Sequence, residues 1–85
     1  MLTFEDCLGL SEITEDEILA IAEHEHIPEV AALELGNFLV HTASGERQIK
    51  RIILDDIAVA RNAHDGKHAA DLQVVLRHFC QEHHV

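Results

Sequence analysis

Cysteine is scarce in this sequence, and its placement excludes two classes of small protein. The 85 residues contain two cysteines, Cys7 and Cys80, which lie far apart and belong to no C-x-x-C pair. A disulfide framework and a cysteine-based zinc finger are therefore excluded. Both cysteines are expected to be ordinary residues on helix faces.

Long apolar runs are also missing. Mean hydropathy is +0.01, and no apolar stretch approaches the roughly 20 residues that span a bilayer, so no membrane association is expected. The first six residues have no basic region and no small-residue cleavage site, which argues against a secretory signal. The sequence predicts a cytoplasmic protein with one domain over residues 1–85.

Basic residues are absent from the first half of the chain. Residues 1–43 contain ten acidic residues and no Lys or Arg, whereas residues 44–85 contain six of each sign, so the net charge of -10 arises in the first half. Such an acidic chain is a poor ligand for nucleic acid, whose phosphates require basic surface. The asymmetry suggests a basic protein partner or association between unlike halves. The explanation that we favour is simple solvation of surface helices by Glu and Asp.

Catalytic motifs are lacking as well. The sequence has no G-x-S-x-G, P-loop, H-E-x-x-H or G-x-G-x-x-G pattern. So short a chain also has little room for a substrate pocket beside its core. These absences favour a non-catalytic protein.

Helical periodicity is the strongest positive signal. Thr14 and Glu17 fit a capping box at the start of a helix, and the single proline, Pro28, separates that helix from the next. Ser44 is predicted to cap the third helix. The expected helices span about 15–25, 28–42, 45–63 and 67–83, after a short N-terminal helical turn over residues 3–9. Short connections and the lack of alternating patterns predict an all-α, compact four-helix antiparallel bundle-like domain.

The apolar positions predict which helix faces are buried. The second helix is apolar over most of its circumference, including Val30 and Phe38. The other three show apolar stripes at helical spacing: Ile18, Leu19, Ile21 and Ala22; Ile49, Ile52, Ile53, Ile57 and Ala60; Ala69, Leu72, Val75, Leu76, Phe79 and Cys80. On the exposed side of the third helix, Glu46–Lys50 and Arg51–Asp55 have the spacing of ion pairs.

Eight histidines suggest a metal site at one end of the bundle. If the helices alternate in direction, five candidate ligands gather there: Glu23, His24, His26, His64 and His68. Imidazole suits Zn²⁺, Ni²⁺ and Cu²⁺. A ferritin-like di-iron centre is not expected, because the chain has a single E-x-x-H pair and its third helix has no inward-facing glutamate. The favoured explanation needs no metal, since histidine is stabilised at helix C-termini by the helix dipole.

The second helix contains two further candidate features. Its polar residues Glu34, Asn37 and His41 lie within about 60° of one another around the helix. One interpretation is that they act as an acid/base pair or as a set of ligands in a dimer. The interpretation that we favour is that they are the one solvated strip of an apolar helix.

The apolar face of this helix suggests self-association. A two-fold interface would bring Ala32, Leu35, Gly36 and Leu39 against their copies, since residues three and four apart share a face. We therefore expect a homodimer. A monomer whose other helices bury this face is the competing arrangement.

These observations predict a small acidic non-catalytic helical protein that acts as a protein–protein interaction or adaptor module. Its acidic first half and the 28–42 helix would provide the binding surfaces. The alternative is a metal-binding or metal-sensing protein that uses the histidine-rich end.

Overall fold

The computed structural model describes residues 12–85, and within this range it contains four helices and no strand. The helices are α2 (Glu15–Glu25), α3 (Glu29–Leu39), α4 (Ala43–Asn62) and α5 (Gly66–His83). The predicted all-α, four-helix architecture is confirmed. The turn predicted over residues 3–9 lies outside the described residues. No described helix combines the length and apolar character needed to cross a bilayer.

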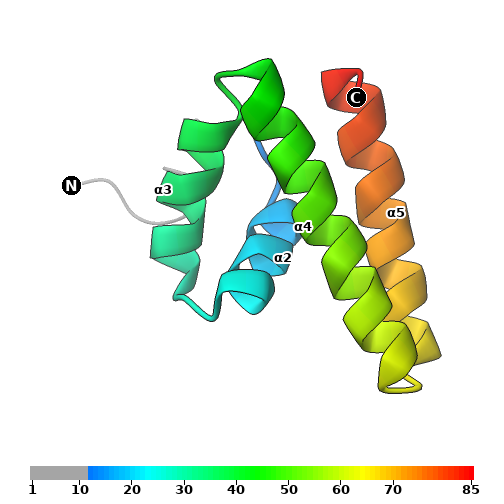
Figure 1. Ribbon diagram of the computed structural model, residues 1–85. Helices are drawn as coiled ribbons and strands as arrows, with labels where there is room; N and C mark the ends of the chain where they lie inside the picture. Colours follow the sequence, from blue (N-terminus) through cyan, green and yellow to red (C-terminus); the bar gives the residue numbers. More distant parts are fainter. Residues whose placement is uncertain (1–11) are drawn as a thin grey trace.

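α2 lies at the centre of the arrangement. It packs on α3, α4 and α5, while α4 and α5 form a long antiparallel pair on one side (Figure 1). α3 packs on α2 and α4, on the side away from α5 (Figure 1). The first half of the chain therefore contacts the second mainly through α2.

Side-chain caps fix where the helices begin. The predicted capping box is present: Thr14 Oγ1 accepts a hydrogen bond from Glu17 N at 3.3 Å, and Glu17 Oε1 accepts one from Thr14 N at 2.9 Å. The cap predicted for the third helix was wrong, because Thr42, not Ser44, accepts from Gly45 N at 2.9 Å. α3 is also shorter than predicted, since the chain must turn at residues 40–42 to enter α4.

Three helix ends use a left-handed histidine where glycine is the usual residue. His26, His64 and His84 have φ angles of 56°, 58° and 57°. In each case the next amide bonds a carbonyl five residues earlier, which is the Schellman pattern: Ile27 N to Ala22 O, Asp65 N to Ala60 O and Val85 N to Cys80 O. Histidine adopts this conformation more often than most side chains.

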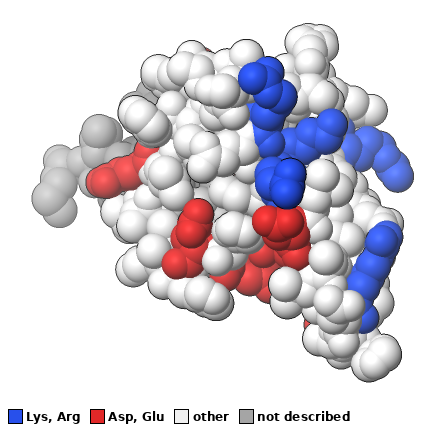
Figure 2. Space-filling model, in the orientation of Figure 1, with Lys and Arg blue, Asp and Glu red and all other residues white. Residues whose placement is uncertain are grey.

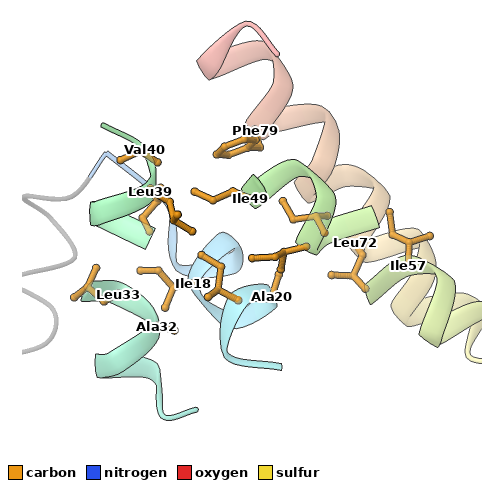
Figure 3. Packing of buried hydrophobic residues seen from close by; sticks show 14 of the residues in the cluster. Ile18, Ala20, Ala32, Leu33, Leu39, Val40, Ile49, Ile57, Leu72 and Phe79 are labelled. Carbon is orange, nitrogen blue, oxygen red and sulfur yellow. The ribbon is translucent and has the colours of Figure 1, made fainter. Parts of the chain in front are cut away.

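The core joins all four helices, and Figure 3 shows isoleucines of α2 and α4 meeting Leu39 and Phe79. The α4 stripe is buried as predicted. Leu19 was wrongly placed in the core: it is 41% exposed, whereas Ala20 is buried. α5 approaches α2 along one edge only, so Leu19 lines a shallow hollow between the two helices. Val30 and Phe38 are exposed as well, because the described helices pack against the other side of α3.

Candidate functional site

The structure brings together two of the five predicted metal ligands. The ring Nε2 of His68, on α5, lies 3.0 Å from both carboxylate oxygens of Glu23, on α2. This hydrogen bond raises the pKa of His68 above its ordinary value. The pair connects the start of α5 to the last turn of α2.

His24 contacts a residue that was not among the candidates. Its Nε2 lies 3.2 Å from Asp55 Oδ2 on α4, and its Nδ1 lies 3.6 Å from Glu25 Oε1. The side chain of His24 is 28% exposed. It therefore links α2 to α4 at the edge of the core.

Asp56, which the sequence patterns did not single out, is the most unusual group in this region. It is 4% exposed, and its Oδ2 has no hydrogen-bond partner among the described residues. Burial, together with the negative charges of Glu23 and Asp55, raises the pKa of Asp56 to about 6, although His24 and His68 act in the opposite direction. The sequence did contain a signal, since position 56 lies one turn from Ile52 and Ala60 on the predicted buried stripe. We call the five residues the acid–histidine cluster: Glu23, His24, Asp55, Asp56 and His68.

The other two predicted ligands do not join this cluster. His26 and His64 are exposed and occupy left-handed positions at the ends of α2 and α4. Within residues 12–85, no three His, Cys, Asp or Glu side chains are placed to hold a metal ion. What the cluster provides is a set of carboxylates and imidazoles from three helices, in which His68 contacts Glu23 and His24 contacts Asp55.

Two further histidines of α5 contact carboxylates on other helices. His83 Nδ1 lies 2.9 Å from Glu46 Oε2 on α4, and His78 Nδ1 lies 3.6 Å from the buried Glu17 Oε2 on α2. The ring of His83 also stacks on Phe79, with centroids 4.3 Å apart. In the described part of the chain, every ion pair between different helices contains a histidine.

The predicted two-fold interface lies inside the protein. Ala32, Gly36 and Leu39 are buried, and Leu35 packs partly against the core. A Cβ atom at Gly36 would overlap the side chain of Ile13. Glycine therefore serves the close packing of α3 within one chain, and these residues do not form an exposed surface.

The exposed side of α3 is the opposite one. Val30 and Phe38 are 57% and 76% exposed, and Glu34 and His41 are exposed with them. We call these four residues the α3 outer face. Beside Phe38, a hollow of about 360 Å³ extends towards Thr42 and Gln48. Of the predicted polar strip, Glu34 and His41 are exposed, whereas Asn37 is partly buried.

Comparison with known proteins gives no family for this chain. No family model matches it, and neither the curated proteins nor the solved structures contain a significant match.

Proposed function

We propose that the protein is a non-catalytic interaction module that binds a basic segment of a partner protein through the α3 outer face. The observation that carries the proposal is Phe38, the most exposed of the large apolar side chains in the described part of the chain. Aromatic side chains are frequent anchors of protein interfaces, and an exposed apolar patch costs solubility unless it is used. The proposal retains the cytoplasmic location expected from the sequence.

Charge defines the partner. Residues 12–43 contain eight acidic residues and no Lys or Arg. Glu34 is one helical turn from both Val30 and Phe38, so a ligand that covers these apolar side chains also meets its carboxylate. An amphipathic helix with an apolar stripe and flanking Lys or Arg would satisfy both requirements.

The hollow beside Phe38 could accept one side chain of the partner. It is lined by residues of the α3–α4 turn, including Thr42, and of the first turns of α4, including Gln48. A partner side chain inserted there would contact the ring of Phe38 on one side. This would make Phe38 the central contact, with Val30 and Glu34 around it.

The test is affinity purification with matched variants. The intact protein, Phe38→Ser and Val74→Ser are compared; Val74 is 61% exposed on α5 and serves as the control. A partner that is retained by the intact protein and by Val74→Ser, lost with Phe38→Ser and cross-linked through a basic segment supports the proposal. Equal capture by Phe38→Ser, or cross-links confined to another surface, would contradict it. Circular dichroism checks that each variant is folded.

Metal binding is a second candidate function, favoured by Asp56. Its buried, unpartnered oxygen is close enough to Glu23 and His68 for their charges to act on it. Rotation of these side chains would be required, because no three donors are already in place within residues 12–85. A metal bound to the native state at a hundredfold excess over Kd raises stability by about 2.7 kcal/mol. An unchanged melting temperature with Zn²⁺, Ni²⁺ and Cu²⁺ would exclude this function.

A further inference from the structure

Three cations lie together on the exposed side of α4. Arg47, Lys50 and Arg51 have the i, i+3, i+4 spacing of one helix face and make up half of the six Lys and Arg residues of the chain. Figure 2 shows Lys and Arg side chains gathered over the upper part of α4, with acidic groups directly below them. With Leu54, His84 and Val85 they line a hollow of about 430 Å³. We call these six residues the α4 basic face.

The acids that could neutralise these cations are held by histidines. Helical spacing would pair Glu46 with Lys50, but Glu46 Oε2 lies 2.9 Å from His83 Nδ1. Asp55 has the spacing to pair with Arg51, yet its Oδ2 lies 3.2 Å from His24 Nε2. The other oxygen of Asp55 is 3.9 Å from Arg51 Nε, at the limit of an ion pair.

The cations are consequently left without strong partners. Arg47 and Lys50 form no ion pair with any residue of the part of the chain that the structure describes. The side chain of Arg51 is 80% exposed. Like charges one turn apart repel, so grouping these residues does not stabilise α4. In a chain with a net charge of -10, two cations without an ion pair beside a third with only a long one, Arg51, point to a ligand.

We propose that the α4 basic face is a docking surface for an acidic segment of a partner protein. Carboxylates of the segment pair with Arg47, Lys50 and Arg51, and one apolar side chain lies in the hollow against Leu54 and Val85. Leu54 is 43% exposed and Val85 is partly buried, so the hollow offers apolar contact that a free phosphate would not use. The strongly acidic remainder of the protein repels nucleic acid.

This surface is separate from the α3 outer face and opposite to it in charge. The proposal therefore does not rest on the function proposed above. If both surfaces are occupied, the protein bridges a basic partner and an acidic one, as an adaptor does.

Fluorescence anisotropy of a labelled peptide tests the proposal with the full chain. The probe is a Glu-rich peptide with a central Leu; the same peptide with Gln in place of Glu, and the same peptide with Ser in place of Leu, are the comparisons. We expect the Glu-Leu peptide to bind most tightly, and Lys50→Glu to weaken binding roughly tenfold. Arg77→Glu on α5 makes the same change of net charge outside the hollow and should leave binding within about twofold.

Several results would overturn the proposal. Equal binding of the Glu and Gln peptides would show that the cations do not select the ligand, and equal loss with Arg77→Glu would show that net charge alone is responsible. Displacement of the peptide by inorganic phosphate at similar concentration would indicate a free-anion site. A dimeric mass in light scattering, in place of 9.5 kDa, that is lost with Lys50→Glu would make a second copy the occupant.

The role of the histidines has its own test. His83→Asn releases Glu46 to pair with Lys50, so it should weaken peptide binding severalfold. The double variant His83→Asn, Glu46→Gln removes the competing carboxylate and should restore binding. A loss of packing around His83 would not be rescued in this way, so failure of the rescue would contradict the assigned role of His83.

Discussion

The two halves of this protein differ in charge, and in the described part of the chain every ion pair between them contains a histidine. α2 and α3 lie in a stretch without Lys or Arg, whereas α4 and α5 carry all six. Within residues 12–85, the ion pairs between the halves nevertheless do not join acids to Lys or Arg. They pair Glu23 with His68, Asp55 with His24 and Glu17 with His78.

The electrostatic attraction between a carboxylate and an imidazole across the two halves therefore depends on whether the imidazole is protonated. A neutral imidazole offers a carboxylate one hydrogen bond, and a protonated imidazole adds opposite charge. Lys and Arg in the same positions would be charged at all physiological pH values. At His68, whose pKa is raised by Glu23, the contact between the halves is stronger in mild acid.

Separating α3 from α2 should destabilise the protein more than any other change considered. Gly36→Arg introduces side-chain atoms where the chain already places Ile13, and it buries a charge. We expect a loss of about 3 kcal/mol or more in the free energy of unfolding, measured with urea. Gly66→Arg is the control, because a Cβ atom at Gly66 would meet no other atom within 4 Å. If Gly36→Arg instead stays folded and turns a dimer into a monomer, the homodimer predicted through this face of α3 would be supported.

Replacing Asp56 should give the next largest change in the free energy of unfolding, and this change should depend on pH. Its pKa in the folded protein is about 6, above the ordinary value of 3.8, so the folded state favours the protonated form. Stability is therefore lost as pH rises from about 4, where the unfolded chain ionises, to about 6, and the full cost is present at pH 8. Asp56→Asn should stabilise the protein by about 2 kcal/mol at pH 8 and by little at pH 4. Equal effects at both values would show that the charge of Asp56 is not the cause.

A change at His68 tests the contact between the two halves, which we call the junction: the pairs Glu23–His68, His24–Asp55 and Glu17–His78. Its pKa is raised in the folded protein, so the stability that it contributes is present below its unfolded pKa and is lost as pH rises through the folded value. Because both side chains are partly exposed, His68→Gln should cost only about 0.5–1 kcal/mol at pH 5.5 and almost nothing at pH 8.5. His41→Gln, on α3 and outside these contacts, is the control. A loss that is the same at both pH values would indicate packing and not charge.

A histidine outside the junction should have a still smaller effect. His64 has a φ of 58°, which glycine adopts at lower cost. His64→Gly should raise stability by about 0.5 kcal/mol. Ala63→Gly, at a neighbouring position with a φ of -84°, should lower it. Destabilisation by His64→Gly would show that the side chain, and not only the backbone, matters there.

Local sequence signals predicted the helices because each signal acts within a few residues. The capping box at Thr14 and the stripe of α4 needed no knowledge of the rest of the chain. Side-chain partners depend on which helices become neighbours, and spacing within one helix cannot supply that. The predicted Arg51–Asp55 pair is present at 3.9 Å, but Asp55 lies closer to His24 of α2, and Glu46 contacts His83 of α5 in place of Lys50.

For α3, too, local sequence signals could not show which residues become neighbours. An almost wholly apolar α3 does not reveal which side faces the core. Gly36 was taken to mark an interface between copies, whereas it marks the closest approach of α3 to Ile13 within one chain. Of the histidine candidates, Glu23 and His68 meet, while His26 and His64 have backbone roles that no ligand pattern could predict.

Protonation of the junction is tested most directly by the free energy of unfolding in urea at pH 5.5 and pH 8, for the intact protein and for the double variant His68→Gln, Asp56→Asn. If protonation strengthens the contact between the halves, the intact protein is more stable at pH 5.5, by about 1.5 kcal/mol. The double variant should lose most of this difference. An intact protein that is equally stable at both pH values, or a double variant with an unchanged difference, would contradict a junction controlled by protonation.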